Sequence, residues 1–202
     1  MTPAQAERAR AHDEFTEMPE GLRLDSPGVE DGAAIWRIAR DSRVLDLNSS
    51  YSYLLWCRDF AATSVVARDA DGTAVGFVTG YIRPQRPGVL VVWQVAVDHA
   101  HRGRGLAGAL LDGLTARVAA TAGIHGVETT ITPDNTASHR LFTSFAQRHG
   151  ADVEREVLFH GSLFPDGAHE PEVLYRIGPL THRGDHLGAS GERAPARRAV
   201  RT

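Results

Sequence analysis

A long apolar strand, a turn rich in glycine and arginine, and a helix together restrict the fold of this chain most. Residues 89–97 read Val-Leu-Val-Val-Trp-Gln-Val-Ala-Val, and this run of β-branched side chains predicts a buried strand. The turn Arg102-Gly-Arg-Gly-Leu-Ala107 follows, and leucines at helical spacing predict a helix over Gly103–Thr121. A strand, turn and helix in this order are typical of a fold that combines α and β elements.

The turn has the chemistry of an anion-binding site. Glycine permits a positive φ and lets a ligand approach the backbone closely. The N-terminus of the following helix presents free N–H groups and the positive end of its dipole. Arg102 and Arg104 add charge, so the turn predicts a pyrophosphate cradle, with a plain strand-to-helix turn as the alternative. It is not a Walker loop, because the Gly-Lys-Ser/Thr ending is missing.

The rest of the pattern predicts one α/β domain over residues 21–180, with a mixed central β-sheet flanked by helices. The Asp69-Ala-Asp-Gly72 segment predicts a hairpin turn, and the Gly- and Pro-rich segment 161–171 predicts a long loop. We expect the remaining strands at 22–24, 63–68, 74–82, 127–131, 153–159 and 173–177, and the remaining helices at 30–41, 51–60 and 135–149, the last capped near Asp134 or Asn135.

The two ends of the chain lack a pattern that could bury a face. Residues 1–20 predict a flexible leader, and residues 181–202 predict a disordered, arginine-rich tail. Hydrophobic residues make up 42% and charged residues 23%, which favours a globular domain between these ends. The longest apolar runs are too short to span a bilayer and none resembles a signal peptide, so we expect a cytoplasmic protein without a membrane partner.

The composition excludes several kinds of chemistry. All 22 basic residues are arginine, which rules out a Schiff-base or catalytic-lysine mechanism. A net charge of −3 indicates no nucleic-acid partner. Cys57 is the single cysteine and lies in an apolar helix, so it favours packing over nucleophilic chemistry. His99 and His101 lack supporting carboxylates, and we predict no metal site.

Two motifs in order resemble the GNAT superfamily of N-acetyltransferases. Arg102-x-x-Gly105-x-Ala107 after an apolar strand is similar to the acetyl-CoA loop of that family, and Thr132–Ser138 followed by Leu141-Phe142 resembles its later helix. Three further segments resemble the diaminobutyrate acetyltransferases of ectoine biosynthesis: Leu45–Cys57, Val92–Asp98 and Glu128–Asn135. The resemblance spans residues 22–178. It implies transfer of acetyl from acetyl-CoA to the γ-amine of L-2,4-diaminobutyrate by direct attack of the deprotonated amine, in a homodimer.

The resemblance also implies which residues bind acetyl-CoA. The backbone of Val95 and Val97 would pair with the pantetheine arm, and Asn135 would hold its amide, with Ser138 and Phe142 along the same wall. Core packing is the alternative for Phe142. The pyrophosphate would receive N–H groups and charge from the turn at Arg102, Gly103, Arg104, Gly105, Leu106 and Ala107.

The standard acid and base of many relatives are missing here. Trp93 and Gln94 stand in the strand where many relatives carry a glutamate, and Phe142 stands where many carry a tyrosine acid. An amine with a pKa near 10 must nevertheless lose a proton before it attacks. The resemblance points to Asp46 and Glu172 as catalytic carboxylates, without deciding which is the base, and a water relay stays open.

The same residues, with others, would bind the diamine substrate. We expect Asp46, Tyr51, Trp93, His169 and Glu172 in its pocket. The structural alternatives are a helix cap for Asp46, core aromatics for Tyr51 and Trp93, and a surface loop histidine for His169. The alternative functions are another small-molecule or peptide N-acetyltransferase, a non-catalytic acyl-CoA sensor and, more weakly, a nucleotide-binding protein.

Overall fold

The computed structural model describes residues 17–165 and 169–180. The predicted tail at 181–202 and most of the predicted leader lie outside these residues. Residues 17–20 belong to the folded part, because Met18 packs against the main core and the carbonyl of Glu20 accepts a hydrogen bond from Arg104 Nη2 at 3.2 Å. Met18 and Glu20, which fall in the predicted leader, thus contact the domain that is predicted from residue 21.

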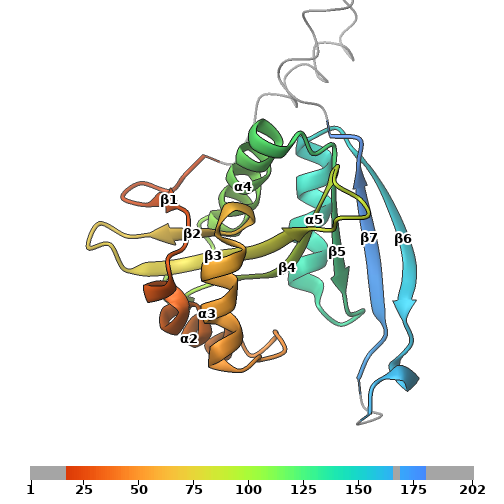
Figure 1. The fold of residues 1–202 in the computed structure, drawn as a ribbon, viewed down its shortest axis with the longest axis horizontal. Coiled ribbons are helices and arrows are strands. Elements are labelled where there is room, and N and C mark those ends of the chain that lie inside the picture. Colours follow the sequence, from red (N-terminus) through yellow and green to blue (C-terminus); the bar gives the residue numbers. More distant parts are fainter. Residues whose placement is uncertain (1–16, 166–168, 181–202) are drawn as a thin grey trace, which may run out of the picture.

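In the part of the chain that the structure describes, seven strands form one mixed sheet in the order β1-β2-β3-β4-β5-β7-β6 (Figure 1). All neighbours are antiparallel except β4 and β5, and β7 is inserted between β5 and β6. The strands are β1 (Arg23–Asp25), β2 (Val65–Arg68), β3 (Ala74–Ile82), β4 (Val89–Val97), β5 (Gly126–Ile131), β6 (Asp152–Phe159) and β7 (Glu172–Gly178). The predicted mixed sheet is confirmed.

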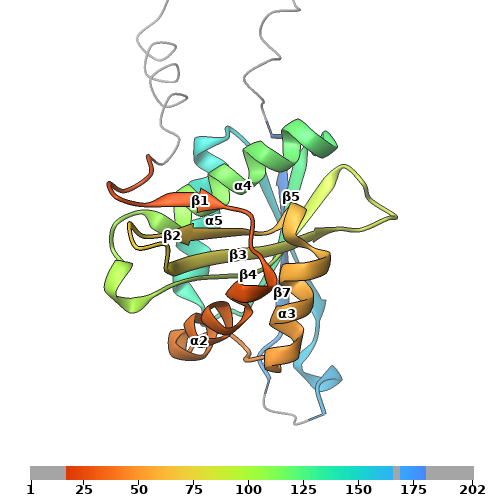
Figure 2. The same cartoon turned by 60° about the vertical axis from the view of Figure 1, so that its left-hand side comes forward.

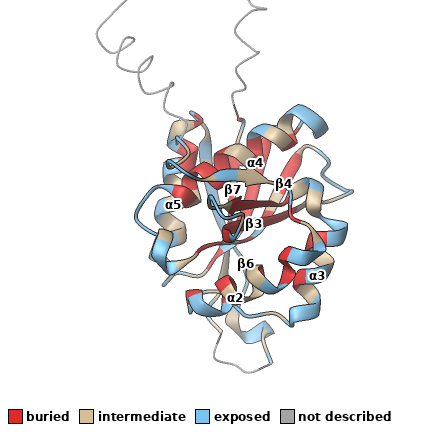
Figure 3. Ribbon diagram, turned by 90° about the vertical axis from the view of Figure 1, so that its left-hand side faces the viewer, coloured by how far each residue is buried: buried red, intermediate tan, exposed pale blue. Residues whose placement is uncertain are grey.

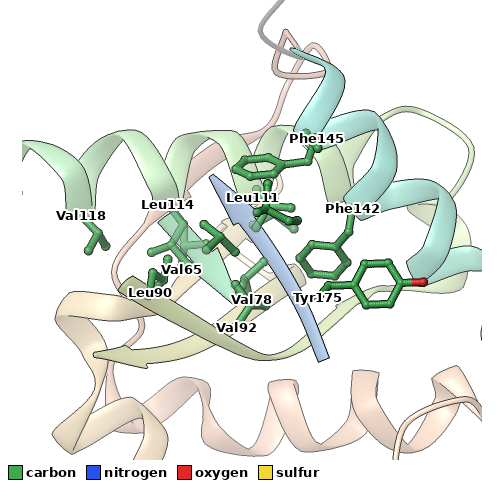
Figure 4. Close-up of a cluster of buried hydrophobic side chains, with 14 of the residues drawn as sticks. Val65, Val78, Leu90, Val92, Leu111, Leu114, Val118, Phe142, Phe145 and Tyr175 are labelled. Atoms are coloured by element: carbon green, nitrogen blue, oxygen red, sulfur yellow. The ribbon is translucent and has the colours of Figure 1, made fainter. Parts of the chain in front are cut away.

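Within residues 17–165 and 169–180, four α-helices flank the sheet on both faces: α2 (Gly32–Ser42), α3 (Ser50–Asp59), α4 (Leu106–Ala122) and α5 (Thr136–Arg148). Successive side chains along a strand point to opposite faces of the sheet, so each face has its own hydrophobic core. Val65, Val78 and Val92 pack with α4 and α5, and Figure 4 shows this cluster extending to Phe142, Phe145 and Tyr175. Intervening strand residues face a second core with α2 and α3: Val66, Phe77 and Ala96 with Ile35, Ile38, Tyr53 and Cys57. Figure 2 shows the two helical layers on opposite sides of the sheet, and Figure 3 shows β3 and β4 buried between them.

The predicted element boundaries are mostly within a few residues of those observed. The helix after the turn begins at Leu106 and not at Gly103, because Gly103 and Gly105 take positive φ angles of 75° and 78° that a helix excludes. The strand predicted from 63 begins at Val65, because residues 61–63 form a 3₁₀ turn. The hairpin turn is confirmed, with Gly72 N–H donating to the carbonyl of Asp69.

The β4 and β5 strands separate after a short paired segment. Their parallel register runs only from Val89 to Val91 on β4, opposite Gly126 to Glu128 on β5. Beyond Val91, β4 continues for six residues whose pairing is with β3 alone up to Val97. The divergence exposes backbone groups of β4 to the gap between the strands, where another extended chain can bind.

A β-bulge interrupts β4 at the same place. Thr79 pairs with Gln94 and Gly80 pairs with Val92, so Trp93 has no partner on β3. The extra residue reverses the alternation of side chains along the strand. As a result, Trp93 and Gln94 both line one cavity although they are consecutive residues.

Candidate active site

Three adjoining cavities follow the gap between β4 and β5. We call them the arginine cavity, the middle slot and the acidic cavity, with volumes of about 550, 270 and 430 Å³. The arginine cavity and the middle slot share Val97, Arg102 and Ala107. The middle slot and the acidic cavity share Leu45 and Asn135. The three form one path from the turn before α4 to the carboxylates near β7.

The arginine cavity has the predicted turn as one wall. Gly103, Gly105, Leu106 and Ala107 line it, and the free N–H groups at the start of α4 follow Gly105. Arg102 lies in the wall and donates from Nε to the carbonyl of Val97 at 3.0 Å. Arg104 is not among the lining residues and donates from Nη2 to the carbonyl of Glu20, so its role toward a phosphate stays a prediction.

The opposite wall of the arginine cavity was not predicted. It comes from one face of α5, on which Ala137, Arg140, Leu141, Ser144 and Arg148 recur at helical spacing. Arg148 is held by a bidentate pair with the buried Asp112, at 3.0 and 3.1 Å. Arg140 is exposed and lines the same cavity. The spacing of three and four residues along the predicted helix could have revealed this wall.

Glycine spacing in the turn also matches a nucleotide-binding motif. Gly103, Gly105 and Gly108 have the G-x-G-x-x-G spacing of a dinucleotide-binding turn. That motif belongs to an open, mostly parallel sheet. Here β4 and β5 are the one parallel pair of the described sheet, so the fold does not support the nucleotide-binding alternative.

The middle slot is apolar and narrow. Val95, Val97, Ala107 and Leu141 line it, with Asn135 and Ser138 at one side. Asn135 caps α5, and its Oδ1 accepts from the Ser138 N–H at 3.0 Å, which confirms the predicted cap and leaves its amide donors available. Phe142 is 1% exposed and does not line any of the three cavities, so core packing describes it.

The acidic cavity brings together residues from distant parts of the chain. Asp46 lies in the loop before α3, and His169 and Glu172 lie just before and at the start of β7. His169 Nε2 is 3.2 Å from Asp46 Oδ2 and 3.9 Å from Glu172 Oε1. The cap of α3 is Ser49, whose side chain accepts from the Ser52 N–H, so the capping alternative for Asp46 is wrong.

His169 is arranged to carry a positive charge. Its Nδ1 lies 2.6 Å from the carbonyl of Glu170 while Nε2 faces the two carboxylates, so both ring nitrogens meet acceptors. The carbonyl of Glu170, then the carboxylate of Asp46, raise the pKa of His169 above its ordinary value. Its ring also stacks on Phe164, with centroids 3.8 Å apart, which limits its rotation.

Trp93 and Tyr51 occupy different positions from those of core aromatics. Trp93 is 51% exposed, lines the acidic cavity and stacks on Trp56 with centroids 6.2 Å apart. Tyr51 is 64% exposed on α3 and is not among the residues that line the cavity. The contact of Tyr51 with a substrate stays a prediction. The buried tyrosine of this helix is Tyr53, two residues further along the chain.

Three side chains of the acidic cavity form the group within the described residues that could ligate a metal ion. One ligand atom each from Asp46, His169 and Glu172 lies within 4.8 Å of the others. Two neighbouring carboxylates suit an ammonium group equally well, since a metal ion and an ammonium group are both cations.

Cys57 is 3% exposed, and burial raises the pKa of its thiol to about 11, so it is a packed thiol as predicted.

The fold and these cavities correspond to a known class of enzyme. The family model described as the acetyltransferase (GNAT) family matches residues 32–146, more than half of the chain. This span holds the diverging strands, the turn at the start of α4 and the Asn135 cap of α5. The chain is therefore an N-acetyltransferase of the GNAT type.

Relatives identify the branch of that class. The L-2,4-diaminobutyric acid acetyltransferase of Streptomyces avermitilis is 70% identical over 182 residues, 90% of this chain and 100% of the relative. The enzyme of that name from Marinococcus halophilus is 45% identical over 80% of this chain and 92% of its own length. Diaminobutyrate acetyltransferase EctA from Paenibacillus lautus, solved with L-2,4-diaminobutyric acid and coenzyme A, is 39% identical with a TM-score of 0.75, covering 80% of this chain and 96% of that one. The chain belongs to the family of L-2,4-diaminobutyric acid acetyltransferases.

Proposed function

We propose that this enzyme transfers the acetyl group of acetyl-CoA to the γ-amine of L-2,4-diaminobutyrate, a step of ectoine biosynthesis. The observation that carries the proposal is the acidic cavity at the end of a path suited to coenzyme A. Asp46 and Glu172 provide two negative charges for a substrate with two ammonium groups. The named relatives support the same substrate.

The path fits coenzyme A by shape and by the chemistry of its walls. Acetyl-CoA supplies the thioester that carries the acetyl group. The turn at 102–107 and Arg140 would bind its phosphates, as free N–H groups and guanidinium groups bind anions. The unpaired edge of β4 at Val95 and Val97 and the amide of Asn135 would hold the pantetheine arm in the apolar middle slot.

The acidic cavity would select and orient the diamine. Asp46 and Glu172 bind its ammonium groups, and Trp93 forms the wall that limits its length. His169 as an imidazolium is the charge in the described wall that suits the substrate carboxylate. Held in this way, the reacting amine needs to lie about 3–3.5 Å from the thioester carbon.

Glu172 is the proposed acceptor of the amine proton. Its side chain is 18% exposed, whereas that of Asp46 is 84% exposed, so Glu172 is the more enclosed of the two carboxylates. The proton passes to Glu172 directly or through a water molecule. Because a thiol has a pKa near 8.5, the departing thiolate needs no strong acid, which agrees with Phe142 at the usual tyrosine position.

The test is the release of free CoA from acetyl-CoA with a panel of amines. Diaminobutyrate, diaminopropionate, ornithine, lysine and a peptide differ in length and in charge near the amine. We expect turnover with diaminobutyrate, and acetylation at the γ-nitrogen by mass spectrometry. Turnover with another amine alone would contradict the substrate, and tight acetyl-CoA binding without turnover would favour the sensor.

The location and assembly of the enzyme are part of the proposal. None of the helices in the described ranges is long and apolar enough to cross a membrane, and we propose a cytoplasmic enzyme. We also propose a homodimer, because Phe60 and Trp93, which both pack on Trp56, are exposed, and Trp93 lines the acidic cavity. Sedimentation velocity tests this assembly, and a monomer at working concentration would contradict it.

A further inference from the structure

A buried chain of hydrogen bonds links the core beneath α3 to the loop that carries Asp46. Tyr53 is 1% exposed, and its hydroxyl donates to Gln94 Oε1 at 3.0 Å. Gln94 is 6% exposed, and its Nε2 donates to the backbone carbonyl of Asp46 at 2.8 Å. Gln94 also lines the acidic cavity from the bulged part of β4.

The chemistry of this chain of bonds permits one orientation of the amide. The Asp46 carbonyl can only accept, so the NH₂ group of Gln94 must face it. Gln94 Oε1 then faces Tyr53, whose hydroxyl must donate. The Asp46 carbonyl therefore fixes the orientation of the Gln94 amide, and the Tyr53 hydroxyl holds the amide oxygen from the other side.

The loop needs such an anchor because the Asp46 side chain is not packed. The side chain of Asp46 is 84% exposed, and residues 43–49 form no regular secondary structure. Its carboxylate nevertheless has to reach across the cavity to within 3.2 Å of His169 Nε2. The position of this carboxylate thus depends on where its backbone is held.

We propose that Gln94 is a positioning residue for the substrate: held in place by the Tyr53 hydroxyl, it holds the Asp46 backbone so that the carboxylate faces the diamine. The inference rests on the proposed function for its substrate. It also gives a physical reason for an amide at this place in the strand. A carboxylate there would turn acceptor oxygens toward the Asp46 carbonyl, and the two would repel.

The experiment compares Gln94→Glu, Gln94→Met and Tyr53→Phe, with Tyr81→Phe as a control that removes a tyrosine hydroxyl from the neighbouring strand β3. Losing a buried hydrogen bond should raise KM for diaminobutyrate at least about tenfold in both Gln94 variants and a few-fold in Tyr53→Phe. The Kd for acetyl-CoA should stay within about twofold, because Gln94 lines the acidic cavity but neither the middle slot nor the arginine cavity. The control should match the unmodified enzyme.

A second measurement needs no substrate. If Asp46 loses its anchor, His169 loses a neighbouring carboxylate, and its pKa, followed by NMR, should fall in Gln94→Met. An unchanged KM for diaminobutyrate together with an unchanged His169 titration would overturn the proposal. Equal losses of affinity for diaminobutyrate and acetyl-CoA would also overturn it, as would a higher kcat in Gln94→Glu. If the Gln94 variants do not fold, Tyr53→Phe decides. If the unmodified enzyme ignores diaminobutyrate, the proposed function fails, while the His169 titration still tests the positioning role.

Discussion

His169 Nε2 lies 3.2 Å from Asp46 Oδ2, although 123 residues separate them in the chain. The contact joins the loop before α3 to the segment before β7 across the acidic cavity. It becomes available because β7 is inserted beside β5, at the open end of the gap between β4 and β5. The contact between Asp46 and His169 therefore joins two walls of the acidic cavity.

The protonation of His169 should depend on this contact. Its raised pKa comes first from the carbonyl of Glu170 and then from Asp46, so NMR titration should find it above the usual value of about 6.5. Asp46→Asn should lower it without abolishing the whole shift. Since the pKa of His169 is raised in the folded state, its charge stabilises the fold fully at a pH below the unfolded pKa. This stabilisation is lost as the pH rises through the folded pKa. Titration at or below the usual value would contradict this arrangement.

The backbone of His169 can be displaced without altering a charged residue. A Cβ added at Gly161 would overlap the carbonyl oxygen of His169, a backbone atom that cannot move easily. Gly161→Ala should therefore shift His169 and raise KM for diaminobutyrate by about tenfold, which corresponds to a loss of about 1.4 kcal/mol in binding. Affinity for acetyl-CoA, measured by calorimetry, should change little. Loss of both affinities would instead indicate damage to the whole fold.

The turn before α4 can be tested with a matched pair of glycines. Gly105 has φ of 78° in the wall of the arginine cavity, and Gly123 has φ of 64° at the far end of the same helix. Alanine at either position should cost about 1–2 kcal/mol of stability, because both conformations are left-handed. Gly105→Ala alone should also raise the Kd for acetyl-CoA, because Gly105 lines the cavity proposed to bind the phosphates. Equal Kd values for the two variants would count against the phosphate assignment.

Asp112 should be important for stability. It is 3% exposed and accepts from Arg148 and His149, thereby joining α4 to the end of α5. Asp112→Asn weakens this buried pair and should lower the free energy of unfolding by about 3 kcal/mol, measured by urea denaturation. The exposed Asp59, paired with its neighbour Arg58, offers a control, and Asp59→Asn should leave the denaturation midpoint unchanged. Equal effects would mean that burial of the pair is unimportant.

Local patterns in the sequence were sufficient for most elements. Alternation and β-branched residues predicted β3 and β4 with their observed ends, and the Asn135 cap and the glycine turn were recognised from single residues. These features are local, because propensity, capping and turn chemistry depend on neighbours within a few positions. The resemblance to a family then supplied Asp46, Trp93, His169 and Glu172, which the structure gathers around one cavity.

Other features depended on pairing between distant segments. The bulge that turns Trp93 and Gln94 into the same cavity follows from the register with β3, and the sequence of β4 alone predicts ordinary alternation. The hydrogen bond from Arg104 to the carbonyl of Glu20 likewise joins residues 84 positions apart, and the sequence near Arg104 does not indicate it.

The sequence by itself determined which residues form strands, helices and the glycine-rich turn before α4, since those preferences act over a few residues. Only the tertiary structure decided that Asp46, Gln94 and His169 meet, through the order of the strands and the extra residue in β4. The physical reason is that a side chain's chemical identity is encoded locally, whereas its neighbours in a site are set by the long-range packing of the sheet.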